Sequence, residues 1–130
     1  MKYRTANEIG AFGERIAFRY LLRHGYLPIK RNYRSGKYEI DLIAIRFSVI
    51  AFVEVKTRTY RNGQTDDSLP PSVAVNRDKI KFTRAAANAY LREHPTKMKP
   101  RMDVLEVWLS PAENGKKPKI LRIHHIPAAY

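Results

Sequence analysis

Cysteine is absent from this sequence of 130 residues. The absence excludes a disulfide framework, a zinc site built from thiolates and a cysteine nucleophile. It agrees with a cytoplasmic location, because disulfides are rare in that compartment, although cysteine-free proteins occur in other compartments as well.

Long hydrophobic runs are also missing. No stretch approaches the roughly 18 to 20 continuous apolar residues of a membrane-spanning helix. Residues 1–6 lack the apolar segment and the cleavage site of a secretory signal. We therefore expect a cytoplasmic protein that has no membrane partner.

Acidic residues are scarce relative to basic ones. The chain has 12 aspartates and glutamates against 25 lysines and arginines, which gives a formal net charge of +13. The basic residues are dispersed along the chain, so they indicate a charged face on a fold. A polyanion such as nucleic acid is the natural partner of such a face, and a solubilising surface is the alternative.

Apolar residues make up 44% of the chain and aromatic residues 11%, enough to fill one core. We therefore expect a single domain over residues 1–130. Helical spacing of apolar residues predicts a helix over residues 7–24, followed by Gly25 as a cap. An extended segment is expected over 26–34, where Pro28 favours an edge strand. Residues 38–45 and 49–57 are typical of an antiparallel hairpin.

The second half of the chain continues the alternation of elements. A loop over residues 58–71 is long for a compact domain and is a candidate functional segment. A helix is expected from residue 73 or 76 to 93, and two further strands over 101–109 and 119–126. The order α, β, β, β, α, β, β predicts an α/β fold in which helices flank a sheet of three to five strands.

Charged residues occur where a core strand is expected. The segment 49–56 is apolar at odd and even positions alike, so both faces should be covered and the strand should be central. Glu54 and Lys56 then share a face with Ile50 and Phe52. Burying isolated charges is expensive, so Glu54 and Lys56 need partners.

The preceding strand supplies one such partner. A register that pairs Ile45 with Ile50 also pairs Asp41 with Glu54, and Glu39 with Lys56. Opposed side chains lie about 4.5 to 5.5 Å apart at Cβ, so two carboxylates would meet on a half-buried surface. A divalent cation such as Mg²⁺ would relieve their repulsion, since it prefers oxygen ligands. Lys56 could then orient a metal-bound water or stabilise phosphate charge.

A third carboxylate can join this pair from the first helix. Glu14 lies beside Ala17 and Leu21 at the margin of the apolar face, so it can face the sheet. The alternative reading is an ordinary cross-strand ion pair, which is the usual meaning of a lone Glu-x-Lys on a strand.

The pattern of Asp41 followed thirteen residues later by Glu54-Val55-Lys56 resembles the PD…(D/E)xK signature of the restriction-endonuclease-like nucleases. A longer set of local matches resembles the YraN family of small predicted endonucleases, similar to archaeal Holliday-junction resolvases. These matches are Gly10-Ala11-Phe12-Gly13-Glu14, Gly25-Tyr26, Arg31-Asn32-Tyr33-Arg34, Glu39-Ile40-Asp41-Leu42-Ile43-Ala44, Phe52-Val53-Glu54-Val55-Lys56-Thr57-Arg58 and Arg101-Met102-Asp103-Val104.

The resemblance implies a restriction-endonuclease-like αβββαβ core with a mixed sheet. It implies that Asp41 and Glu54 bind Mg²⁺ or Mn²⁺, that Glu14 completes the site, and that Lys56 is the catalytic lysine. Two positions depart from the pattern: Ile40 stands where the signature has proline, and Tyr38 where the family usually has glycine.

The function implied is a metal-dependent endonuclease that hydrolyses phosphodiester bonds in DNA, including branched or repair intermediates. The alternative is a nucleic-acid-binding protein whose nuclease site is weak or inactive. A homodimer is left open. The side chains expected to contact phosphates are all basic: Arg31, Arg34, Arg58, Arg77, Lys81 and Arg84. For those on the second helix, a solvated face is the alternative.

Overall fold

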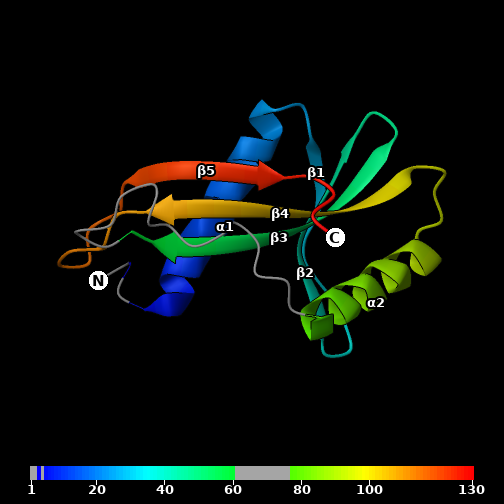
Figure 1. Ribbon diagram of the computed structural model, residues 1–130, viewed down its shortest axis with the longest axis horizontal. Helices are drawn as coiled ribbons and strands as arrows, with labels where there is room; N and C mark the ends of the chain where they lie inside the picture. The colour runs from blue at the N-terminus through cyan, green and yellow to red at the C-terminus, as the bar shows by residue number, and fades with distance from the viewer. Residues whose placement is uncertain (1–2, 4, 61–76) are drawn as a thin grey trace.

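The computed structural model of the protein describes residues 3, 5–60 and 77–130. Two helices and five strands follow one another in the order that the sequence predicts (Figure 1). In chain order they are α1 (Ala6–Arg23), β1 (Leu27–Ser35), β2 (Tyr38–Arg46), β3 (Val49–Thr59), α2 (Arg77–Glu93), β4 (Lys99–Leu109) and β5 (Ile120–Ile126). The α/β class is thereby confirmed.

The five strands form one mixed sheet in the order β1-β2-β3-β4-β5. β3 and β4 are parallel, and every other neighbouring pair is antiparallel. β3 therefore occupies the central position that its two-sided apolar pattern predicts. β1 is an edge strand, as Pro28 predicts, and its pairing with β2 is irregular between Pro28 and Lys30.

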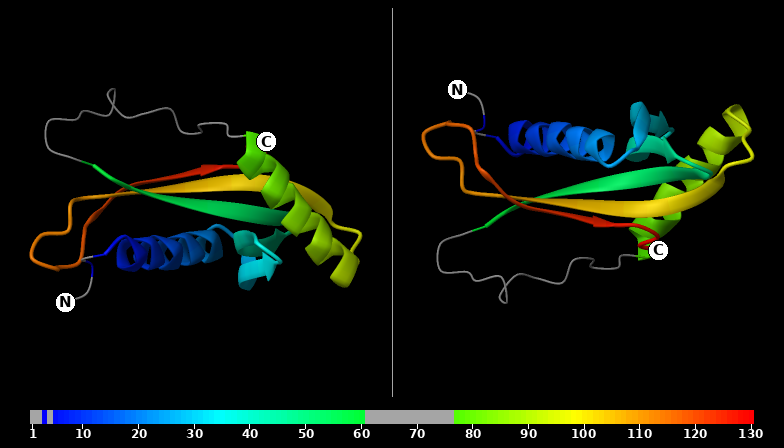
Figure 2. Two further views of the ribbon diagram at one scale, coloured as in Figure 1. Left: turned by 90° about the horizontal axis from the view of Figure 1, so that it is seen from below. Right: turned by 90° about the horizontal axis from the view of Figure 1, so that it is seen from above.

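The two helices cover opposite faces of the sheet (Figure 2). Phe12, Ile16 and Leu21 of α1 pack on one face, where Leu42 and Val53 point toward them. On the other face a second core lies beneath α2 and contains Ile43, Phe52, Ala86, Ala87 and Tyr90. A side chain on a central strand of the sheet is therefore covered by one of the two cores, whichever face it points to.

α1 begins with a capping box. The Thr5 hydroxyl accepts from the Glu8 backbone N–H at 3.1 Å, and the Glu8 carboxylate accepts from the Thr5 N–H at 3.1 Å. Such a cap contributes about 1 kcal/mol. Gly13 lets the helix lie close to β3, because a Cβ at this position would overlap the Thr57 side chain. This close approach sets the height above the sheet of Glu14, the next residue.

The middle of the chain differs from the expectation. β3 extends to Thr59, so Arg58 is a strand residue and does not belong to the predicted loop. Parallel pairing with β4, which continues to Thr59 and Leu109, explains the extension. Residues 61–71 of the predicted loop and the predicted helix starts at 73 and 76 lie outside the described residues. Neither helix in the described part of the chain has the length and apolar content that a membrane crossing requires.

Candidate metal and nucleic-acid site

The β2–β3 hairpin has the predicted register but splits before the carboxylates. Ile45 pairs with Ile50, as predicted. In the described chain the ladder ends at Leu42 and Val53, so the expected pairing of Asp41 with Glu54 does not form. The Asp41 carboxylate instead accepts a hydrogen bond of 2.8 Å from the Val55 backbone N–H. A hydrogen bond from the backbone of β3 to the Asp41 side chain thus replaces the backbone ladder between β2 and β3 at this point.

The expected pairing of Glu39 with Lys56 is also absent. Glu39 lies opposite Arg34 on β1, and Lys56 lies opposite Glu106 on β4. The strands divide because β3 follows β4 from Glu54 onward, while β2 stays paired with β1.

Asp41 lies where β2 changes face. Ile40 packs in the core under α2, whereas Leu42 packs in the core under α1, although residues two apart on a regular strand share a face. Across the ladder, Asn32 of β1 has a φ of +48°, a left-handed conformation that asparagine tolerates better than most residues. Asp41 consequently lines a cavity of about 210 Å³ on the α1 side and one of about 40 Å³ on the α2 side.

The Asp41 carboxyl is costly to ionise in this position. Burial, together with the negative charges of Glu14, Glu39 and Glu54, raises its pKa from 3.8 to about 6, and the hydrogen bond from Val55 opposes this rise. Among the described residues no lysine, arginine or histidine forms an ion pair with Asp41. A cation is the missing partner that would favour its charged form.

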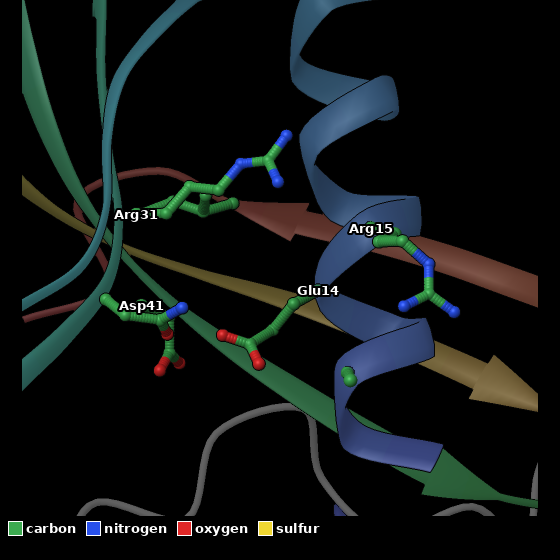
Figure 3. A pocket seen from close by; sticks show the side chains of 7 residues that line it. Glu14, Arg15, Arg31 and Asp41 are labelled. Carbon is green, nitrogen blue, oxygen red and sulfur yellow. The ribbon is translucent and has the colours of Figure 1, made fainter. Parts of the chain in front are cut away.

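Glu14 approaches Asp41 from α1. Its side chain extends from the helix toward the Asp41 carboxylate, and both line the larger cavity (Figure 3). Burial, and then the charge of Glu39, raise the pKa of Glu14 above its usual value. Two carboxylates with raised pKa values therefore face one cavity, as the position of Glu14 on the helix predicts.

Glu54 lies on the α2 side of the sheet. It lines the smaller cavity together with Asp41, and its side chain is 15% exposed. The Lys79 ammonium of α2 lies 3.3 Å from its carboxylate. Glu54 thus has a protein cation beside it, whereas Asp41 has none within the described residues.

Lys56 is half-buried on β3, two residues beyond Glu54. Alternation along the strand places it on the face that carries Glu54. Within the described ranges it forms no ion pair, so its ammonium is not committed to a protein carboxylate there. It does not line either cavity around Asp41.

The donor chemistry around Asp41 fits a hard divalent cation. The side chains are carboxylates, which are the ligands of Mg²⁺ and Mn²⁺, and the charge of Asp41 is uncompensated. In residues 3, 5–60 and 77–130, however, no three His, Cys, Asp or Glu side chains come close enough together to hold a metal ion. Asp41 and Glu54 would have to draw together, and Glu54 would have to exchange Lys79 for the metal.

The predicted phosphate contacts on β1 lie beside this site. Arg31 lines the larger cavity, with its guanidinium 4.0 Å from the centre of the Phe18 ring. Arg34 is 73% exposed and lies 3.5 Å from the Glu39 carboxylate. Both are accessible cations near Asp41, which is where a phosphate would need them.

The other predicted phosphate contacts divide into two kinds. Arg58 donates a 3.0 Å hydrogen bond to the fully buried Glu106, so its charge neutralises a carboxylate within the sheet. Arg77, Lys81 and Arg84 are exposed on α2. The three α2 residues can face a polyanion, whereas the charge of Arg58 is already paired with that of Glu106.

Sequence reasoning gave no role to several residues that shape the site. Lys79 pairs with Glu54, while Arg15 and Asn32 line the larger cavity with Asp41. Helical spacing on α2 was the only available signal for Lys79. The sequence predicts that Glu14 of α1 approaches Asp41 of β2, but nothing in it indicates that Arg15 and Asn32 share their cavity.

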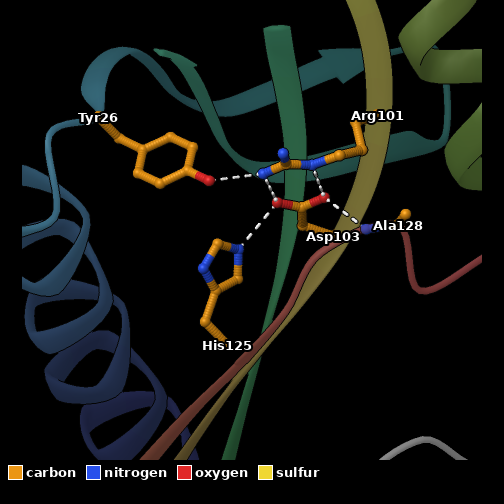
Figure 4. A network of polar contacts seen from close by, with 5 residues as sticks. All are labelled: Tyr26, Arg101, Asp103, His125 and Ala128. Atoms are coloured by element: carbon orange, nitrogen blue, oxygen red, sulfur yellow. Dashed lines mark hydrogen bonds and ion pairs between the residues drawn. The ribbon is translucent and has the colours of Figure 1, made fainter. Parts of the chain in front are cut away.

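The Arg101-Met102-Asp103-Val104 motif forms a separate buried network (Figure 4). Asp103 accepts from Arg101 at 2.8 and 2.7 Å, from His125 at 2.8 Å and from the Ala128 backbone N–H at 3.1 Å. The Tyr26 hydroxyl accepts a 2.6 Å bond from Arg101. The network joins β4, β5 and the segments after α1 and β5.

Comparison with known proteins identifies the family. Residues 13–107 match the family described as "Uncharacterised protein family UPF0102". A UPF0102 protein of Bacteroides thetaiotaomicron is 38% identical over 124 residues, which cover 95% of this chain and 93% of that one. One from Caldanaerobacter subterraneus is 36% identical over 131 residues, covering both chains completely. One from Chlorobium phaeobacteroides is 43% identical over 101 residues, covering 76% and 75%. The chain belongs to the UPF0102 family, which is the YraN family.

Proposed function

We propose that this UPF0102 protein is an endonuclease of the restriction-endonuclease-like superfamily that hydrolyses phosphodiester bonds in DNA with Mg²⁺ or Mn²⁺ in the cytoplasm. The observation that carries the proposal is Asp41. Its carboxyl is partly buried, its pKa is raised to about 6, and it shares one cavity with Glu14 and another with Glu54. Strongly perturbed groups in a cavity are typical of catalytic sites.

Each carboxylate has a role set by its position. Asp41 and Glu54 would hold the metal from either side of the split between β2 and β3, and Glu14 would complete the site from α1. A metal held there would polarise a phosphoryl oxygen and lower the pKa of the attacking water. Lys56, beyond Glu54 on β3, would place its ammonium against a phosphate oxygen as negative charge develops. Water adds to phosphorus, the bond to one sugar oxygen breaks, and that oxygen takes the proton.

The basic surface supports a nucleic-acid substrate. Arg31 lines the larger cavity, and Arg34 pairs with Glu39, which lines the smaller one. Arg77, Lys81 and Arg84 are exposed on α2. With about five phosphate contacts, the logarithm of the binding constant on duplex DNA should fall with the logarithm of salt concentration at a slope of about −4 to −5. A slope near zero would remove the polyanion from the proposal.

A second function is favoured by one specific observation. Lys79 already neutralises Glu54, and the described residues form no three-ligand cluster. A protein that binds nucleic acid without cutting it would have this arrangement. Metal binding at Asp41 and Glu54 separates the two functions, because only the nuclease requires it.

The test is a cleavage panel. End-labelled duplex, single-stranded and four-way-junction DNAs are incubated with protein and Mn²⁺, Mg²⁺ or EDTA, and products are resolved on denaturing gels. The expected result is cleavage of at least one substrate that requires the metal. Asp41→Asn should abolish it while leaving DNA affinity unchanged or higher, since the change removes a negative charge beside the phosphate.

A matched control guards against a contaminating nuclease. Glu113→Gln removes one exposed carboxylate from the turn between β4 and β5, far along the chain from the site. It should cut like the unmodified protein. If Asp41→Asn cuts as well as Glu113→Gln, the activity does not come from this site.

A further inference from the structure

The tip of the β2–β3 hairpin carries the most exposed large apolar side chain of the described chain. Phe47 is 86% exposed, and the next large apolar residue in exposure, Leu27, is 56% exposed. Phe47 also has a φ of +52°, a conformation that is unfavourable for a bulky aromatic residue. The chain therefore holds a ring in water at a local cost in backbone energy. Neither feature belongs to the core or to the Asp41 site.

The hairpin tip is held in place from two sides. The Ser48 carbonyl accepts a 2.7 Å hydrogen bond from the Lys99 backbone N–H at the start of β4. The Arg46 guanidinium lies 5.0 Å from the centre of the Phe47 ring and 5.4 Å from that of the buried Tyr26. Arg46 thus links the exposed ring to the body of the protein. Phe47 is presented on a supported turn, which projects at the end of the sheet where β4 begins (Figure 1).

The surroundings of the tip are cationic. Three segments meet at this end of the sheet, residues 24–28, 44–50 and 97–101, and none of them contains an aspartate or a glutamate. Arg46, Lys97 and Lys99 are exposed there. An apolar partner protein gains nothing from this field, whereas a polyanion with flat apolar surfaces is attracted by it. Nucleic-acid bases have such surfaces.

We propose that Phe47 is a base-stacking contact, and that the protein binds nucleic acid with an unpaired or unstacked base at this tip while Arg46 and Lys99 contact the adjoining phosphates. The inference rests on the proposed nucleic-acid substrate and deepens it. It predicts that the protein binds nucleic acids with exposed bases, such as bulges, forks and junctions, more tightly than uninterrupted duplex. Stacking of a base on an aromatic ring tolerates any base, so no sequence preference follows from it.

The tip is separate from the metal site. Arg46 lies five positions beyond Asp41 on β2, which at about 3.3 Å per residue is roughly 16 Å. Successive nucleotides advance by about 3.4 Å, so the two sites are about five nucleotides apart on one strand. A change at Phe47 therefore leaves the carboxylates in place.

The experiment compares two DNA probes of equal charge in EDTA. One is a continuous duplex and the other has a single unpaired base, and binding of each is measured by fluorescence anisotropy. Unmodified protein should bind the probe with the unpaired base about 5- to 150-fold more tightly, the range expected for one stacked base. Phe47→Asn should bind both probes with the affinity that the unmodified protein shows for the duplex.

Asparagine is chosen because it tolerates a positive φ, so thermal melting should be unchanged or higher. Phe47→Trp should retain the preference, and Phe47→Leu should lose most of it because leucine has no aromatic face. Leu121→Asn is the matched control, since it removes a 50% exposed apolar side chain at the other end of the sheet. It should bind like the unmodified protein.

Equal binding of the two probes by the unmodified protein, or the same preference in Phe47→Asn, would overturn the proposal. A dimer in sedimentation that Phe47→Asn converts to monomer, with no effect on DNA, would also overturn it and assign the ring to a second copy of the chain. Metal-dependent cleavage with no Phe47 effect leaves the nuclease standing alone. A Phe47 effect without cleavage leaves this proposal standing alone.

Discussion

Asp41 of β2 is partly buried and Asp103 of β4 is fully buried in the same sheet, and their pKa values move in opposite directions. Burial pushes the pKa of Asp103 upward, but the hydrogen bonds from His125, Arg101 and Ala128 outweigh it and hold the pKa below the usual value. Burial raises the pKa of Asp41 to about 6, and only one backbone hydrogen bond opposes it.

The difference lies in what each carboxylate faces. Asp103 is surrounded by an arginine, a histidine and a backbone N–H, so its charge is satisfied within the protein. Asp41 faces carboxylates. A buried charge that has hydrogen-bond and ion-pair partners in the protein holds elements together. A buried charge without them lowers stability, and such charges are typical of sites where a ligand supplies the missing partner. The comparison therefore indicates that Asp103 stabilises the fold, and it supports the proposed role of Asp41 as a metal ligand.

The largest expected effect comes from removing the charge of Asp103, the carboxylate that has partners within the protein. Asp103→Asn leaves the Arg101 guanidinium beside a neutral group in a buried setting, which should cost about 3 kcal/mol of unfolding free energy. Urea denaturation at pH 7 measures it. Glu113→Gln, which removes an exposed carboxylate, should stay within about 0.5 kcal/mol of the unmodified protein. A loss below about 1 kcal/mol in Asp103→Asn would show that the network is not a stabilising one.

The second prediction concerns the binding of a metal ion at Asp41. Mn²⁺ at one hundred times its dissociation constant should stabilise the unmodified protein by about 2.7 kcal/mol, because only the folded state assembles the site. Asp41→Asn should show no such gain. Thermal melts with and without Mn²⁺ provide the measurement, with Glu113→Gln expected to respond like the unmodified protein. Equal stabilisation of Asp41→Asn would place the metal elsewhere.

The third prediction uses pH to change the charge of Asp41 and thereby its effect on the stability of the fold. The folded pKa of Asp41, about 6, lies above its unfolded value of 3.8, so its ionisation destabilises the fold above pH 6 and has no effect below about pH 4. Without metal, Asp41→Asn should therefore be more stable than the unmodified protein by about 3 kcal/mol at pH 7, and this advantage should vanish below about pH 4.

Asp103 has the opposite sign. Its folded pKa is lowered, so its stabilisation is present above its unfolded pKa of 3.8 and is lost as pH falls through the folded value. Urea titrations of both variants between pH 3 and 7 give the two curves. A pH-independent difference between Asp41→Asn and the unmodified protein would contradict the raised pKa.

The smallest effect concerns Lys79, which pairs with the candidate ligand Glu54. Lys79→Gln removes a half-exposed ion pair with Glu54 and should change stability by less than about 1 kcal/mol. It also removes a positive charge that competes with the metal, so Mn²⁺ should bind about 5-fold more tightly in calorimetric titrations. Lys81→Gln, an exposed neighbour on α2, is the control and should change little. Unchanged or weaker Mn²⁺ binding in Lys79→Gln would exclude Glu54 as a ligand.

Much of the fold could be predicted because its signals are local. The apolar spacing of α1 and the two-sided apolar pattern of β3 each follow from which faces a helix or strand must bury. The register of Ile45 with Ile50 follows from a short hairpin connection. The extension of β3 to Thr59 could not be predicted, because it depends on parallel pairing with β4 some fifty residues away.

The sequence by itself determined that Asp41, Glu54 and Glu14 are carboxylates on elements that must bury apolar faces, and that basic residues exceed acidic ones. Only the tertiary structure decided what each carboxylate meets. The split between β2 and β3, the turn of β2 at Asp41 and the pairing of Glu54 with Lys79 arise from contacts between distant segments. Because the energy of a buried charge depends on the groups within a few ångströms of it, those contacts distinguish Asp41 from Asp103.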